Sequence, residues 1–155
     1  MQKIRHSVVL RGTPQEVFRQ LAHVPNFTCF CDHVTEIVDL GDNQWRWTVE
    51  VLGRPFSFDV EVTESVEPDR FAWRSIRGIR NSGAYHLSRE DASHTRVAFE
   101  LQYQLGSTLL EMAARRAAGS LVERISGQML DRVQQAVDRH REPTSRDTPA
   151  PISAS

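Results

Sequence analysis

Two polar side chains fall where the strand pattern places apolar ones. Arg77 shares its alternation with Phe71 and Trp73, and Tyr85 follows the next turn with the same expected orientation. If both point inward, the Arg77 guanidinium could polarise a carbonyl, and the Tyr85 hydroxyl could donate or relay a proton. The alternative is that Arg77 extends to solvent and that Tyr85 is a core ring with its hydroxyl satisfied. Arg77 and Tyr85 are therefore the candidate catalytic residues.

A second group of reactive side chains lies within residues 23–33, namely His23, Cys29, Cys31, Asp32 and His33. Zinc ligands usually stand two to four residues apart and are joined by a distant second pair, which Cys-x-Cys-Asp-His lacks. We predict no metal and no cofactor, since phosphate loops, nucleophile motifs and dinucleotide fingerprints are also missing. Cys29 and Cys31 are expected to stay reduced. His33 is kept as a polar group at a pocket entrance.

Length and charge restrict the class of protein. The chain has 155 residues, of which 39% are apolar and 25% charged, which fits one soluble globular domain. Lys plus Arg number 19 against 20 for Asp plus Glu, so no overall field attracts phosphate backbones. We expect no nucleic-acid partner. No apolar stretch approaches the roughly 18 residues of a membrane span, and the opening residues do not resemble a signal peptide. The predicted location is the cytoplasm.

The elements that must position these residues follow from hydrophobic periodicity. Residues 3–11 alternate with period two and predict a strand. The capping box Thr13-Pro14-Gln15-Glu16 predicts a short helix ending near Pro25, and residues 26–31 predict a second. From Val34, alternation and turn residues predict six consecutive strands in an antiparallel meander, with Gly78 and Gly83 bracketing one turn.

After Gly106 the period changes to three and four residues. This spacing predicts one long amphipathic helix from about Thr108 to about His140. From Pro143 the apolar periodicity is lost, which predicts a disordered tail. The expected organisation is one domain over residues 1–142 and a tail over residues 143–155.

The inward-facing positions of the predicted strands are rich in aromatic residues. A sheet of this size curls, and one helix about 10 Å wide does not fill its concave side, so a pocket is expected there. For any single ring, the alternative is ordinary core packing. The predicted pocket residues come from the strands, the short helices and the long helix: Phe27, Phe30, His33, Trp45, Trp47, Phe58, Trp73, Phe99 and Gly119.

Three features of the sequence resemble a known family. They are the order of elements, the Asn26-Phe27 pair after Pro25, and the opening Ser7-Val8-Val9-Leu10-Arg11-Gly12-Thr13-Pro14-Gln15-Glu16-Val17-Phe18. Over about Lys3 to Arg141 the chain resembles the START-like helix-grip superfamily, also called SRPBCC. It looks most like the polyketide cyclase/dehydrase group and the related coenzyme-Q-binding subgroup. The resemblance implies an α+β fold, in which seven antiparallel strands grip the C-terminal helix around a deep pocket for a hydrophobic ligand.

Three functions are compatible with this resemblance, because fold does not fix function. The first is binding of a hydrophobic small molecule of polyketide, lipid or isoprenoid-quinone type. The second is a cofactor-independent cyclase or dehydratase acting on a poly-β-keto or aromatic substrate. The third is a protein-interaction module whose pocket is filled by its own side chains. The predicted partner is a hydrophobic small molecule, and a homodimer is left open.

Overall fold

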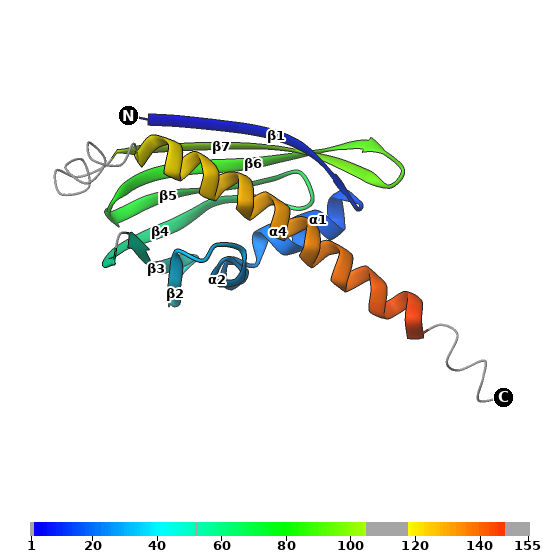
Figure 1. The fold of residues 1–155 in the computed structure, drawn as a ribbon, viewed down its shortest axis with the longest axis horizontal. Coiled ribbons are helices and arrows are strands. Elements are labelled where there is room, and N and C mark those ends of the chain that lie inside the picture. The colour runs from blue at the N-terminus through cyan, green and yellow to red at the C-terminus, as the bar shows by residue number, and fades with distance from the viewer. Residues whose placement is uncertain (1, 52, 105–117, 148–155) are drawn as a thin grey trace.

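A curved antiparallel sheet forms the body of the protein (Figure 1). The computed structural model describes residues 2–51, 53–104 and 118–147. The seven strands lie in the order β1-β7-β6-β5-β4-β3-β2, so only β1 leaves the meander, to pair with β7. Their bounds are β1 (Gln2–Arg11), β2 (Val34–Gly41), β3 (Gln44–Val51), β4 (Arg54–Val66), β5 (Arg70–Gly78), β6 (Arg80–Asp91) and β7 (His94–Gln104). The predicted helix-grip α+β fold is confirmed.

Helices cover one face of this sheet. They are α1 (Pro14–Ala22), the short 3-10 helix η1 (Val24–Asn26), α2 (Phe27–Phe30) and α4 (Ala118–Asp147). The predicted capping box starts α1, because the Glu16 amide donates to Thr13 Oγ1 at 3.2 Å and the Thr13 amide donates to Glu16 Oε1 at 2.9 Å. In Figure 1, α4 runs obliquely across the sheet and continues beyond it. We call the covered face the inner face.

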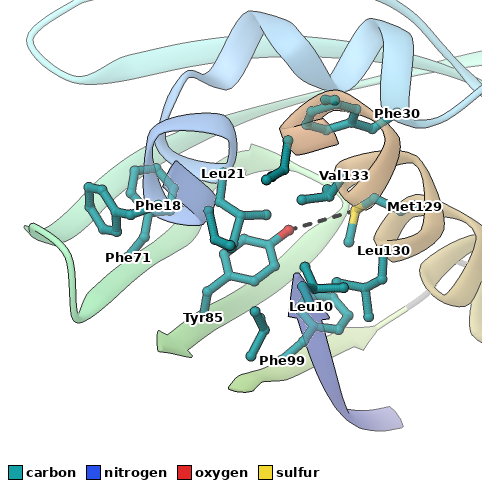
Figure 2. Packing of buried hydrophobic residues seen from close by; sticks show 14 of the residues in the cluster. Leu10, Phe18, Leu21, Phe30, Phe71, Tyr85, Phe99, Met129, Leu130 and Val133 are labelled. Atoms are coloured by element: carbon teal, nitrogen blue, oxygen red, sulfur yellow. Dashed lines mark hydrogen bonds between the residues drawn. The ribbon is translucent and has the colours of Figure 1, made fainter. Parts of the chain in front are cut away.

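The solid part of the core lies where α1 and α4 meet the sheet (Figure 2). Val17 and Leu21 of α1, Val97 of β7, and Val133 and Val137 of α4 are all at most 1% exposed. The spacing of four within both helices aligns each pair on one face. Burying such a side chain contributes about 1.5–3 kcal/mol, so this cluster fixes the helices against the sheet.

Polar contacts hold the same part of α4 in place. Gln134 pairs with the backbone of Arg11, accepting its N–H at 2.8 Å and donating to its carbonyl at 3.1 Å. The Arg11 guanidinium also reaches Asp138, at 2.7 Å. Arg132 forms two bonds to the Asp32 carboxylate, at 2.7 and 2.9 Å. Helix α4 is therefore anchored both to the end of β1 and to the loop before β2.

The structure corrects two predicted boundaries. Gly83 lies inside β6 rather than at a turn, because β6 already begins at Arg80. The long helix does not stop near His140: α4 continues through Pro143 to Asp147, so it overlaps the first residues of the predicted tail. A proline removes one backbone donor, yet extending an existing helix is much easier than starting one. The predicted helix start at Thr108 and residues 148–155 lie outside the described residues.

Within the described ranges, no helix combines the length and apolarity needed to cross a bilayer.

Candidate ligand-binding site

Rings from four strands form a row across the inner face. His6, Phe99, Tyr85 and Phe71 are successive cross-strand partners on β1, β7, β6 and β5. Directly opposed residues share one face of a sheet, so all four side chains lie on the same side. The Tyr85 and Phe99 ring centroids are 5.2 Å apart, and those of His6 and Phe99 are 6.3 Å apart with nearly parallel planes. This row is the centre of the inner face.

Tyr85 points inward, as its alternation predicted. The residue is 2% exposed, and its hydroxyl donates to the Met129 sulfur of α4 at 3.7 Å (Figure 2). Burial raises the pKa of the Tyr85 hydroxyl, so it stays protonated at neutral pH. A thioether is a weak acceptor, which leaves this hydroxyl able to donate to a better one. Tyr85 is thus a buried proton donor, and a catalytic role for it stays a prediction.

Arg77 lies on the opposite face, so its expected inward orientation is wrong. Its guanidinium Nε donates to Asp59 at 2.9 Å, and the Arg77 side chain is 59% exposed. The reason is a bulge in β5: Asp59 pairs with Arg77 while Val60 pairs with Ser75, so Ile76 is an extra residue and the alternation reverses. The predicted pair of Arg77 and Tyr85 is therefore not assembled.

Asp59 is the centre of the cluster that Arg77 joins. Arg46, its cross-strand partner on β3, donates to it from Nε at 2.9 Å and from Nη2 at 3.2 Å. Hydrogen bonds from Arg46 and then Arg77 lower the pKa of the Asp59 carboxyl to about 2. An ionised carboxylate between two arginines on the outer face is a strand-joining contact rather than a catalytic group.

The aromatic contacts continue from the central row towards β3 and β4. Phe27 of α2 lies 6.4 Å from Tyr85 and 5.5 Å from Trp47, measured between ring centroids. Trp47 in turn stacks on Phe58, its cross-strand partner, at 5.9 Å. We call this connected set of rings the aromatic band: His6, Phe99, Tyr85, Trp73, Phe27, Trp47 and Phe58.

Burial varies along this band. Phe27 and Phe99 are 5% and 3% exposed and belong to the solid core. Trp47, Phe58 and Trp73 are only half-buried, although they lie on the same face. Phe27 and Phe99 are thus core residues, whereas the β3–β4 end presents apolar ring surface that the core does not cover.

The remaining predicted pocket residues have different surroundings. Phe30 is buried against Phe27, at 5.3 Å, and serves the core. His33 is half-buried, and its Nδ1 lies 2.9 Å from the Glu50 carbonyl oxygen, which ties it to the end of β3. Trp45 is half-buried on the inner face. Gly119 is part of α4, but its surroundings lie outside the described residues.

The cysteines near α2 show no assembled reactive centre. Cys29 and Cys31 are both free, and burial raises the pKa of the Cys31 thiol. In the part of the chain that the structure describes, no three His, Cys, Asp or Glu side chains gather to hold a metal ion.

The inner face carries two unpaired polar atoms, one on the predicted pocket residue Trp47 and one on His6, which was not predicted as a site residue. His6 Nε2 and Trp47 Nε1 are buried and have no hydrogen-bond partner among the described residues. By contrast, Trp73 Nε1 donates to Asn81 Oδ1 at 3.0 Å. The signal for His6 was its position among the apolar residues of β1, but alternation alone does not show whether a partner is present.

A curved sheet closed by one long helix, with an aromatic inner face, is the helix-grip arrangement. Residues 11–130 match the family described as polyketide cyclase/dehydrase and lipid transport. The chain belongs to this family. Membership supports a role in binding a hydrophobic small molecule or in cyclase chemistry, without naming the ligand.

The individual relatives are distant. An uncharacterised 17.2 kDa protein of Streptomyces lincolnensis is 26% identical over 104 residues, which are 66% of this chain and 69% of that protein. A conserved protein of Geobacillus kaustophilus superposes with a TM-score of 0.77 at 13% identity, covering 89% of this chain and 96% of the other. The Zhui aromatase/cyclase of a Streptomyces species gives 0.70 at 19% identity, covering 89% and 94%. These structural matches show the fold.

Proposed function

We propose that this protein binds a hydrophobic small molecule, of polyketide, lipid or isoprenoid-quinone type, between the inner face and α4. The observation that carries the proposal is the half-buried aromatic surface of Trp45, Trp47 and Phe58, which continues directly from the buried core. Covering apolar surface is worth about 25 cal/mol per Å², so a few hundred Å² of ligand contact gives several kcal/mol before association costs.

Binding is favoured over catalysis by the position of Arg77. Cyclase or dehydratase chemistry needs at least two polar groups that converge on the substrate. Arg77 is held on the outer face by Asp59, which leaves Tyr85 without the partner proposed for it. Cyclase activity stays the second candidate, because the buried, protonated Tyr85 hydroxyl makes its one hydrogen bond among the described residues to a thioether, which is a weak acceptor. A module with a filled pocket is disfavoured by the half-buried rings.

The first test is recovery of a bound compound. Native mass spectrometry of protein purified from its own host, followed by organic extraction, should give a mass above that of the chain and an apolar compound. In parallel, purified protein should be stabilised in thermal-shift assays by decylubiquinone, oleate or a hydroxylated anthraquinone. Recovery of no compound, together with no shift for any of the three, would contradict the proposal.

A matched pair of variants locates the binding surface. Phe58→Gln places an amide on the half-buried inner face, whereas Ser57→Gln adds the same side chain on the exposed outer face. Phe58→Gln should weaken binding of the recovered compound by about tenfold or more, because ligand contact then buries a polar group. Ser57→Gln should leave binding unchanged. Equal affinity of both variants would place the ligand elsewhere.

A further inference from the structure

The two edge strands of the sheet carry opposite charge. β1 and β2 lie at opposite edges (Figure 1), and among the described strands each pairs on one side only. Residues 2–11 contain two arginines, one lysine and one histidine but no acid, whereas residues 34–43 contain Glu36, Asp39 and Asp42 but no base. An open edge is a template for pairing with another chain. In this protein the basic edge and the acidic edge are complementary to each other.

Every second residue of β1 turns its backbone N–H and C=O away from β7. The Gly12 amide donates to the carbonyl of Ser93, whereas both backbone groups of Arg11 bond to the Gln134 side chain of α4. The register between β1 and β7 has no shift, so this alternation holds along the strand. The free backbone groups belong to four residues whose side chains are exposed on the outer face: Lys3, Arg5, Ser7 and Val9.

β2 has a shorter stretch of free backbone. Even-numbered residues of β3 face β2, because the Glu50 amide donates to the His33 carbonyl at 2.8 Å and β3 pairs with β4 without a shift. Their opposed partners include Glu36 and Val38, whose backbone groups are therefore used within the sheet. Ile37, between them, turns its N–H and C=O to the free edge. The side chains of Glu36 and Val38 are exposed on the outer face.

Strand direction determines how the two edges fit together. All neighbouring strands are antiparallel, so β1 and β2, the first and last of seven, run the same way. A second copy with its helices on the same side therefore brings its β1 beside β2 in parallel. In a parallel pair, a residue with free backbone groups lies opposite one whose groups are already used. If Arg5 lies opposite Glu36, Ser7 lies opposite Val38, and all four side chains share the outer face.

We propose that copies of this chain associate head to tail, with β1 of one copy extending the sheet of the next copy at β2. Arg5 then forms an ion pair with Glu36 of the second copy, and Val38, which is 38% exposed in the single chain, is covered. A contact between two β1 strands or between two β2 strands would bring like charges together, which disfavours both. This inference goes beyond the proposed function and does not depend on the ligand.

The mass of the full chain in solution tests the association. Head-to-tail contacts are open-ended, so sedimentation velocity should show a weight-average mass that grows from about 10 μM to about 1 mM protein without stopping at two chains. The association constant should be about tenfold lower at about 500 mM salt than at about 50 mM, because the charges are exposed. A chain that stays monomeric throughout, or a mass that stops at two chains, overturns the proposal.

Charge reversal identifies the two edges. Arg5→Glu and Glu36→Arg should each weaken self-association by about tenfold or more. An equimolar mixture of the two variants should restore it, because the reversed residues then lie opposite each other. The control Arg74→Glu makes the same charge change on the outer face of the central strand β5 and should leave association unchanged. Equal effects at Arg5 and Arg74, or no recovery in the mixture, overturn the assignment of the edges.

A second pair of variants tests the backbone contact. Ser7→Pro removes an N–H that faces the free edge and leaves the hydrogen bonds between β1 and β7 in place. It should weaken self-association by about tenfold, whereas Ser7→Ala keeps the N–H and should not. Thermal unfolding checks that both variants are folded, and equal association of the two folded variants contradicts a continuous sheet. A monomeric chain that still binds a synthetic peptide of residues 2–11 would assign the β2 edge to a different protein and overturn the contact between copies.

Discussion

Trp73 lies directly over Gly83, its cross-strand partner, so closely that a Cβ atom at Gly83 would be 2.4 Å from the indole Cζ2 and 2.6 Å from the Glu100 carbonyl oxygen. Gly83→Ala should therefore lower the free energy of unfolding by about 1–3 kcal/mol, because the indole or the backbone must shift. Urea denaturation measures the change, and tryptophan fluorescence reports displacement of Trp73.

Gly127 provides the control for this substitution. It lies in α4, and an added Cβ would meet nothing within 4 Å. Gly127→Ala should stabilise the protein by about 0.5–1 kcal/mol, because alanine has the higher helix propensity. Similar effects at the two glycines would contradict the close packing of Trp73 on Gly83.

Asp59 should make stability depend on pH in the acid range. Arg46 and Arg77 lower the pKa of the Asp59 carboxyl from 3.8 to about 2. The carboxyl therefore loses its proton more readily in the folded protein than in the unfolded chain. This stabilisation is present above about pH 4 and is lost as pH falls through about 2. Asp59→Asn should cost about 1–2 kcal/mol at pH 7, and the gap from the unaltered protein should close on acidification. Urea titrations across this pH range measure it.

Arg77 gives a separate prediction for the same cluster. Arg77→Gln should reduce stability less than Asp59→Asn, because Arg46 still holds the carboxylate. Ligand affinity should stay within twofold of the unaltered protein, since Arg77 is on the outer face. A larger loss of ligand affinity, with the free energy of unfolding unchanged, would show that Arg77 takes part in binding.

The contact between Tyr85 and Met129 predicts unequal effects of removing its two partners. Tyr85→Phe should cost less than about 1 kcal/mol, because a sulfur acceptor makes a weak bond. Met129→Leu nearly conserves volume but leaves the buried hydroxyl without its acceptor, so its cost should be larger. In the double variant no hydroxyl is left unpaired. The loss in free energy of unfolding should therefore be about that of Tyr85→Phe, together with the small packing cost of replacing Met129 by leucine. Thermal and urea unfolding of the three variants provide the comparison.

Gln134 should protect the end of β1 from local opening. Its amide pairs with both the N–H and the carbonyl of Arg11. Gln134→Ala should cost about 1–2 kcal/mol and should speed hydrogen exchange at the Arg11 amide. Gln135→Ala, at an exposed position of the same helix, is the control and should change neither. Unchanged exchange in Gln134→Ala would contradict this protective role of Gln134.

Local sequence patterns predicted most of the helices and strands that the structure describes. Alternation from Val34 onward gave the six-strand meander, and the Thr13–Glu16 capping box gave the start of α1, because both depend on neighbouring residues. The inward orientation of Tyr85 followed from the same local pattern. The end of the long helix was wrong, since Pro143 lowers helix propensity without preventing the backbone from continuing.

Tertiary structure decided which side chains belong to the site. The bulge at Ile76 places Arg77 beside Asp59 on the outer face, and a bulge depends on how β5 pairs with β4 rather than on β5 itself. Likewise, strand pairing places Asn81 where its side chain accepts a hydrogen bond from the Trp73 indole, whereas the Trp47 indole has no acceptor among the described residues. Local sequence thus determined which face each regular strand turns inward, whereas hydrogen-bond partners come from residues distant in the chain and are fixed only when the sheet assembles.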